Sequence, residues 1–271
     1  MMSPARRPIG VYLNDLRAEP REALRLAASL GYNAVQIEAG QGPLSPSQLS
    51  ESGRRHLTRF ADGLGLSIVA LRADLDGASS PDTTSLEQLV DCTPRILQLA
   101  RDLNVTTVTA PVGRFRLSDQ HDYELVRHAL AQIADTASRL DRTFAPDTTL
   151  DSPDSLAGLL RDLNCPNLGV CYDPAELLVE GIDSLAAVET LADNIALACV
   201  RDAQARSAER AGRETNLGDG HLNLPDYLAQ LEAAGYRGPL IVRRSQSANP
   251  ANDLKQCRTY LEAVLTARAP H

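Results

Sequence analysis

The sequence predicts a single α/β domain over residues 1–271, folded as one (β/α)8 barrel of the TIM type. Short apolar runs alternate with longer segments whose apolar residues recur at helical spacing, and eight such strand–helix pairs fit the length. The strand runs are mostly continuous apolar stretches, as expected when both faces of a parallel sheet are covered. No G-x-G-x-x-G or P-loop follows the first strand, and Gly and Pro fall at unit boundaries, so a two-domain dinucleotide-binding fold is disfavoured.

Eight strands are expected at the apolar runs. They are Ile9–Leu13, Ala34–Ile37, Ile68–Leu71, Val105–Thr109, Thr143–Ala145, Leu168–Tyr172, Ile195–Val200 and Leu240–Val242. The fifth run, in the middle of the chain, carries the weakest strand pattern. Because helices alternate with these strands, we expect parallel pairing through right-handed crossovers.

Eight helices are expected between and after the strands. Ser45 is the predicted N-cap of the second, with Pro46 as its first residue. Gly31 is expected to end the first helix. The predicted segments are Pro20–Leu30, 46–63, Ser85–Leu103, Asp122–Leu140, Pro153–Leu163, Asp183–Leu191, Pro225–Ala234 and Asn252–Ala267.

Composition excludes several classes of function. The chain has 27 basic and 35 acidic residues, a net charge of −8, so we expect no nucleic-acid partner. No apolar run reaches the roughly 18–20 residues that span a bilayer, and the N-terminus lacks the apolar segment of a signal peptide. We therefore expect a cytoplasmic protein without a membrane partner. The five cysteines are widely spaced and contain no CxxC, which indicates reduced, mostly buried thiols.

Polar residues follow nearly every predicted strand. In a TIM barrel the chemistry takes place at the carboxyl ends of the strands, so these residues predict a pocket for a small polar substrate. They are Asn14, Asp15, Glu38, Arg72, Asp74, Pro111, Gly113, Asp147, Asp173, Cys199, Arg201, Asp202, Arg243, Arg244 and Ser245.

The second half of the chain carries a more specific pattern. Its segments are 166–174 (PNLGVCYDP), 200–203 (VRDA), 212–214 (GRE), 217–220 (LGDG) and 232–240 (EAAGYRGPL). Over Asn164–Arg244 the chain resembles the xylose isomerase-like TIM barrels, the sugar phosphate isomerase/epimerase superfamily. This superfamily includes tagatose 3-epimerase-like enzymes, hydroxypyruvate isomerase, inosose dehydratase and endonuclease IV. Over residues 1–140 the resemblance lies in layout, with 35–38 as the nearest local match. The resemblance to this family implies a pocket for a small sugar, polyol or sugar phosphate.

The resemblance also implies a divalent metal, and here the chain departs from the family. The family's ligands are Glu, Asp, His and Glu at the ends of strands five to eight, and the corresponding residues are Asp147, Asp173, Cys199 and Arg243. One guanidinium with two carboxylates has the same net charge as three carboxylates with a divalent ion. A unit charge about 4 Å from a divalent ion would cost roughly 8 kcal/mol at an effective dielectric constant near 20.

Our hypothesis is that Arg243 takes the metal's electrostatic role between Asp147 and Asp173, and that no cofactor is needed. In the alternative, a divalent ion (Zn, Mn or Mg) is held by Asp147, Asp173 and Cys199. Cys199 is otherwise expected as a small buried residue. Asp173 could simply cap a helix, and Asp147 could cap or turn the chain before Thr148.

Further candidates for substrate binding carry structural alternatives. Glu38 lines the pocket or makes a structural hydrogen bond. Arg72 and Arg114 would suit an anionic substrate, although a solvated charge at the rim is the favoured interpretation for each. The candidates are Glu38, Arg72, Arg201, Asp202, Gly218 and Gly220.

Two of these sites lie after the seventh strand. Arg201 and Asp202 form a salt link at the rim or contact an anionic substrate. The segment 218–220 is either a phosphate-binding loop or an ordinary turn, with the turn favoured.

Three hypotheses follow for function. The first is an isomerase- or epimerase-like enzyme acting on a small hydroxy-carbonyl or polyol compound, with Asp173 or Asp147 as base and Arg243 stabilising the oxyanion. Arg cannot accept a proton, so one-base isomerisation, dehydration or ring formation is favoured over two-base epimerisation. The second is a barrel that has lost catalysis and binds a small polar ligand or a partner chain. The third is a metal-dependent isomerase or epimerase with altered ligands. Barrels of this family often form homo-oligomers, and the sequence singles out no interface.

Overall fold

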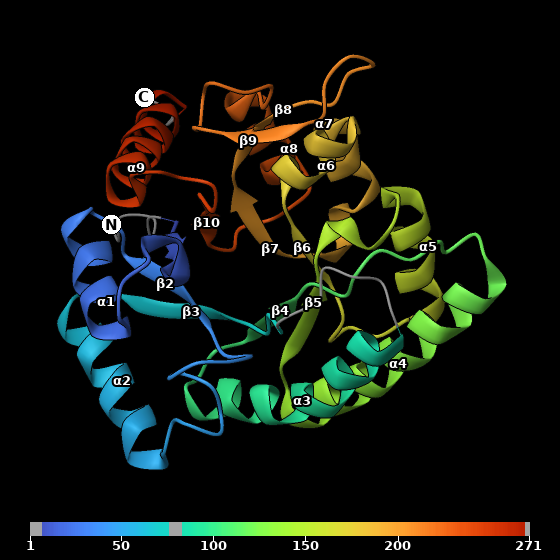
Figure 1. The fold of residues 1–271 in the computed structure, drawn as a ribbon, viewed down its shortest axis with the longest axis horizontal. Coiled ribbons are helices and arrows are strands. Elements are labelled where there is room, and N and C mark those ends of the chain that lie inside the picture. The colour runs from blue at the N-terminus through green and yellow to red at the C-terminus, as the bar shows by residue number, and fades with distance from the viewer. Residues whose placement is uncertain (1–6, 76–82, 269–271) are drawn as a thin grey trace.

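Eight parallel strands form a nearly closed barrel in the computed structural model, which describes residues 7–75 and 83–268 (Figure 1). This is the predicted TIM barrel, and the expected runs coincide with its strands to within two residues. The strands are β1 (Ile9–Tyr12), β2 (Ala34–Glu38), β3 (Ser67–Arg72), β4 (Thr107–Ala110), β5 (Thr143–Pro146), β6 (Val170–Tyr172), β7 (Ile195–Val200) and β10 (Leu240–Val242).

Helices surround the barrel on the outside (Figure 1). The second one begins at Glu51 and not at Pro46, because the Ser50 hydroxyl, instead of Ser45, accepts the hydrogen bond from the Gly53 amide that caps it. The helices are α1 (Pro20–Ser29), α2 (Glu51–Gly63), α3 (Thr83–Asp102), α4 (Gln120–Leu140), α5 (Pro153–Leu163), α6 (Pro174–Glu180), α7 (Ser184–Thr190), α8 (Leu224–Ala233) and α9 (Pro250–Ala267). In the described part of the chain, none of them is long and apolar enough to cross a membrane.

The strands follow the order β5-β4-β3-β2-β1-β10-β7-β6, so the first and last barrel strands pair in parallel. Between β5 and β6 the barrel closes through two isolated bridges, Phe144 with Leu168 and Asp147 with Cys171. We call this junction the β5–β6 seam.

Two apolar layers hold the barrel together. The larger one lies between the strands and the surrounding helices. The smaller one fills the barrel interior and consists of Tyr12, Ala70, Ala145, Cys171, Leu197, Cys199 and Ile241. The interior is narrow at Gly10, where an added Cβ would lie 2.7 Å from Ile241 Cδ1. The cysteines in the described residues are free thiols, and Cys171, Cys199 and Cys257 are buried.

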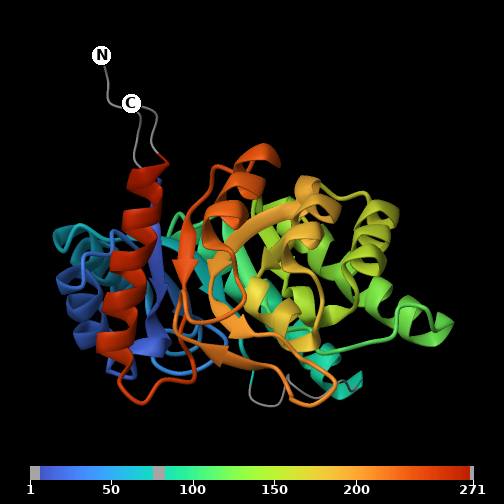
Figure 2. The ribbon, with the colours of Figure 1, turned by 90° about the horizontal axis from the view of Figure 1, so that it is seen from above.

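Two elements near the carboxyl ends of the strands were not predicted. One is α6, which starts directly after β6. The other is an antiparallel hairpin of β8 (Asp202–Gln204) and β9 (Arg213–Thr215), which follows β7. Figure 2 shows this hairpin at the edge of the molecule that lies far from the C-terminal end of α9. Both elements contribute side chains to the site described next.

Candidate active site at the carboxyl ends of the strands

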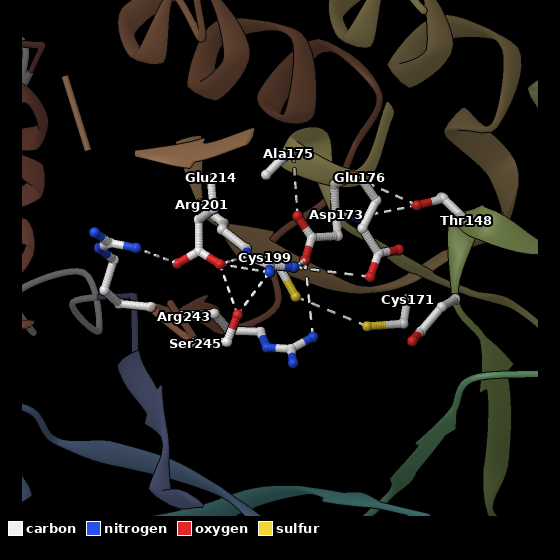
Figure 3. A network of polar contacts seen from close by, with 12 residues as sticks. Thr148, Cys171, Asp173, Ala175, Glu176, Cys199, Arg201, Glu214, Arg243 and Ser245 are labelled. Atoms are coloured by element: carbon white, nitrogen blue, oxygen red, sulfur yellow. Dashed lines mark hydrogen bonds and ion pairs between the residues drawn. The ribbon is translucent and has the colours of Figure 1, made fainter. Parts of the chain in front are cut away.

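Buried and half-buried arginines and carboxylates gather at the carboxyl ends of the barrel strands, above the apolar interior. We call this group the charged cluster. The strand order brings its members together from β3, β5, β6, β7, β9 and β10 and from the start of α6. Figure 3 labels five of them, namely Asp173, Glu176, Arg201, Glu214 and Arg243. The cluster consists of Arg72, Asp147, Asp173, Glu176, Arg201, Glu214, Arg243 and Arg244.

Arg72 and Asp147 form a two-pronged ion pair. Arg72 Nη1 and Nη2 donate to the two oxygens of Asp147 at 3.1 and 2.7 Å, and the two side chains are only 4% and 3% exposed. Burial alone would raise the pKa of the Asp147 carboxyl, but the Arg72 charge and hydrogen bonds outweigh it and hold that pKa below its ordinary value. The interpretation of Arg72 as a solvated rim charge is therefore wrong.

Arg201 joins the end of β6 to the β8–β9 hairpin. Its Nη1 donates to Asp173 Oδ2 at 3.2 Å, and its Nη2 donates to Glu214 Oε2 at 2.6 Å. Burial opposes ionisation of Glu214, but the Arg201 charge and hydrogen bonds from Ser245, Arg244 and Arg201 lower its pKa to about 2. Arg201 therefore pairs with Asp173 and Glu214, and the expected salt link to Asp202 is wrong.

Arg243 is the cation of the cluster with the weakest pairing. Its Nη1 lies 3.8 Å from Asp173 Oδ2, and its Cζ lies 5.0 Å from the centre of the Tyr12 ring. The side chain is 8% exposed, and Nε is buried without a hydrogen-bond partner among the described residues. Arg243 therefore does not bridge the two aspartates as expected, because Arg72 pairs with Asp147. Arg201 makes the shorter contact with Asp173 (Figure 3).

Asp173 has both of the roles that its sequence position suggested, as a helix cap and as a residue of the candidate site. Its Oδ1 accepts the Ala175 amide at 3.0 Å and so caps α6, while its Oδ2 faces Arg201 and Arg243. The carboxylate is therefore part of the cluster and also fixes where α6 begins.

Asp202 organises the loop that follows the hairpin. Its carboxylate accepts the backbone amides of Ala203, Gly218, Gly220 and Leu222 at 2.8–3.0 Å. An added Cβ at Gly220 would lie 2.1 Å from Asp202 Oδ1, so the close approach requires glycine. Because the two glycine amides already donate to Asp202, the structure favours the turn over a phosphate-binding loop.

Glu38 makes the structural hydrogen bonds that its sequence position allowed. It accepts the Tyr12 hydroxyl at 2.7 Å and the backbone amides of Gly40 and Asp74 at 2.6 and 3.1 Å. Burial outweighs these bonds and raises the pKa of Glu38 to about 7. Arg114 is 52% exposed and pairs with Glu180, in keeping with a charge at the rim.

Glu176 was missed by the sequence analysis. It lies in the first turn of α6, where its Oε1 is 3.8 Å from Arg201 Nη1 and its Oε2 is buried without a hydrogen-bond partner among the described residues. It also lines a cleft of about 360 Å³ beside the cluster. Glu214 lies in segment 212–214, which resembles the family, but no role was predicted for it. Two sequence features could have pointed to these residues. One is the Asp173-Pro174 pair at which α6 begins, and the other is segment 212–214 (GRE), which leads into β9.

The residues at the family's ligand positions do not fit a divalent cation. Both oxygens of Asp147 accept hydrogen bonds from Arg72, and Asp173 Oδ2 faces two guanidinium groups. The Cys199 thiol lies within the apolar interior, 3.8 Å from the Cys171 sulfur, and Arg243 places a positive charge at the fourth position. Within residues 7–75 and 83–268, no group of three or more His, Cys, Asp or Glu side chains is arranged to hold a metal ion.

Several solved structures share this fold. A xylose isomerase domain protein from Planctomyces limnophilus matches with a TM-score of 0.82 and 22% identity, covering 96% of this chain and 97% of that one. D-psicose 3-epimerase with D-tagatose, from Clostridium cellulolyticum H10, matches with a TM-score of 0.74 and 14% identity, over 95% and 99% of the two chains. A xylose isomerase-like TIM barrel protein from Mycobacterium smegmatis in complex with magnesium matches with a TM-score of 0.76 and 16% identity, over 98% and 99%.

None of the curated proteins matches the chain significantly. The family model described as xylose isomerase-like TIM barrel, however, matches residues 24–263, which is most of the sequence. The strand order and the structural matches agree with it. The chain therefore belongs to the xylose isomerase-like TIM barrel family.

Proposed function

We propose that this chain is a sugar isomerase- or epimerase-like enzyme that acts on a small hydroxy-carbonyl or polyol compound without a divalent metal. Its family and its structural likeness to a D-psicose 3-epimerase with D-tagatose and to an L-ribulose 3-epimerase support the substrate class. The observation that carries the proposal is Arg243, a buried and weakly paired guanidinium at one of the family's metal-ligand positions. The substrate site is the mouth of the barrel.

The chemistry requires a base and a group that stabilises negative charge. Asp173 removes the proton from the carbon next to the carbonyl, and the carbonyl oxygen takes up the electron pair. Arg243, 3.8 Å from Asp173, stabilises the oxyanion with its guanidinium donors. Asp147 is the poorer base, because the Arg72 guanidinium donates to both of its oxygens, whereas cations face only Oδ2 of Asp173 and a backbone amide donates to its Oδ1. Since Arg243 cannot accept a proton, one carboxylate moves the carbon-bound proton.

Deuterium exchange tests this function. The wild type is incubated in D2O with D-tagatose, D-fructose, D-psicose or L-ribulose, with and without EDTA, and exchange next to the carbonyl is followed by NMR. We expect exchange that EDTA leaves unchanged, and a loss of about 10²–10³-fold in Arg243→Met. Arg161→Met, which removes an exposed arginine of α5, is the matched control. Exchange that EDTA abolishes and Mg²⁺ or Mn²⁺ restores would contradict the proposal.

Metal content provides a second test. Purified wild-type protein should contain no stoichiometric metal, whereas Arg243→Glu, which restores the family's carboxylate, should gain about one divalent ion per chain. A stoichiometric metal in the wild type would favour the third hypothesis, a metal-dependent enzyme with altered ligands.

A ligand-binding barrel without catalysis is the second candidate. It is favoured by the pairing of Asp147 with Arg72 and of Asp173 with Arg201, which leaves neither aspartate free of a cation. Calorimetric binding of one of the four sugars without any deuterium exchange would support this candidate over the enzyme.

A further inference from the structure

A cleft opens beside the charged cluster, between the segment after β5 and helix α6. Its volume is about 360 Å³, and the residues that line it include Thr148, Thr149 and Ser152. Phe115 and Leu177 contribute an apolar part of the wall. Hydroxyl groups beside an apolar wall match the hydroxyls and C–H faces of a sugar-like compound.

Glu176 belongs both to the wall of this cleft and to the charged cluster (Figure 3). Arg201 Nη1 contacts Asp173 Oδ2 at 3.2 Å and Glu176 Oε1 at 3.8 Å, so one guanidinium holds the two carboxyl groups near each other. Their surroundings differ. Asp173 accepts hydrogen bonds from Ala175 and Arg201, whereas Glu176 Oε2 has no partner in the described part of the chain. Two neighbouring carboxyl groups in different surroundings are suited to separate roles as base and acid.

The charges around Glu176 favour its neutral form. Burial raises its pKa to about 8, and the charges of Asp147 and Asp173 act in the same direction, against the opposing effects of Arg201 and Arg243. A carboxyl group that is mostly protonated at pH 7 can donate a proton. The other ionisable residues that line the cleft are Arg114, Asp151 and Glu180.

We propose that Glu176 is a catalytic acid and base for a hydroxy-carbonyl compound bound where this cleft meets the charged cluster at the mouth of the barrel, an inference that rests on the proposed function. Asp173 takes the proton of the hydroxyl-bearing carbon, and the electron pair of the broken C–H bond forms a C=C bond. The carbonyl π pair moves to oxygen, which receives the Glu176 proton and gives an enediol. The Glu176 carboxylate then takes the proton of the second hydroxyl as the new C=O forms, and Asp173 returns its proton to the other carbon. Both carboxyl groups are restored.

Glu176→Gln tests the proposal with nearly unchanged shape. In the deuterium-exchange assay with D-tagatose, D-fructose, D-psicose and L-ribulose, we expect kcat to fall by about 10²–10⁴-fold with little change in KM. The decline of the wild-type rate above about pH 8 should be absent from the residual activity of Glu176→Gln. Glu176→Asp, which keeps a carboxyl group, should recover part of the loss. Glu189→Gln, which changes an exposed carboxylate of α7, is the matched control.

A second measurement needs no substrate. Infrared spectra of the wild type at pH 7 should show a protonated carboxylic acid band that Glu176→Gln reduces and Glu189→Gln does not. An exchange rate in Glu176→Gln within about fivefold of wild type would overturn the proposal, and so would a band that this substitution leaves unchanged. If the wild type exchanges deuterium into none of the four sugars, the proposed function fails. The infrared band then tests separately whether the Glu176 carboxyl group is protonated at pH 7.

Discussion

Breaking the Arg72–Asp147 pair should destabilise the fold strongly. Arg72→Met removes both hydrogen bonds and leaves the Asp147 carboxylate, 3% exposed, without its cation. Losing one partner of a buried ion pair costs about 3–5 kcal/mol, a large part of the roughly 5–15 kcal/mol that stabilises a typical domain. With an unfolding entropy of about 2.1 cal/mol/K per residue, this cost lowers the Tm of a 271-residue chain by about 5–9 °C.

Denaturant and thermal unfolding of a double-mutant cycle provide the assay. The single variants Arg72→Met and Asp147→Leu should each be destabilised, and the double variant should regain much of the loss because no buried charge is left alone. The folded-state pKa of Asp147 lies below its ordinary value of 3.8. The pair's contribution is therefore present above pH 3.8 and is lost as pH falls through the lower folded pKa.

Two results would refute this reasoning. One is a loss below about 1 kcal/mol in Arg72→Met, which is the range of an exposed ion pair. The other is a double variant whose loss equals the sum of the two single losses, because the two side chains would then contribute independently.

Three further perturbations have expected outcomes. Burial raises the pKa of Glu38 from 4.5 to about 7, so Glu38 should contribute a fall of about 3 kcal/mol in the free energy of unfolding as pH rises from 4.5 to 7. Glu38→Gln should lack this part of the fall. A flat wild-type profile, measured by urea unfolding, would contradict this. Asp202→Ala should lower the free energy of unfolding by at least about 2 kcal/mol and speed hydrogen exchange at the Gly218 and Gly220 amides. Unchanged protection of these two amides would contradict this prediction. Arg243→Met should stay within about 1 kcal/mol of wild type in urea unfolding, because its Nε is unpartnered, and a loss above about 2 kcal/mol would be inconsistent with weak pairing.

Local sequence patterns predicted most of the fold. The runs Ile195–Val200 and Leu240–Val242 coincide with β7 and β10, because buried parallel strands require continuous apolar residues. Helix α6 and the β8–β9 hairpin were missed, because both are short and lie directly after barrel strands. The start of α2 was misplaced because the Ser45-Pro46 pair carries a helix-start signal, whereas in the structure the Ser50 hydroxyl caps the helix.

The candidate site was predicted in part. Strand ends placed Arg72, Asp147, Asp173, Arg201 and Arg243 at one mouth, because parallel strands share a direction. Which guanidinium meets which carboxylate depends on strand order and side-chain reach, and neither is encoded in local spacing. Glu176 and Glu214 escaped assignment because they lie on the two elements that were missed.

The β5–β6 seam has a consequence for how the barrel moves. The other strand pairs are each joined over at least three residue pairs, whereas the seam has two isolated bridges. The Thr148 hydroxyl adds to it, because it donates to the Asp173 carbonyl at 3.5 Å and accepts the Asp173 amide at 3.4 Å. Local opening is least costly where backbone hydrogen bonds are fewest. Thr148 also lines the cleft that holds Glu176. We therefore expect the barrel to open locally at this junction first. A molecule bound in the cleft would hold the segments on both sides of the junction together and oppose this opening.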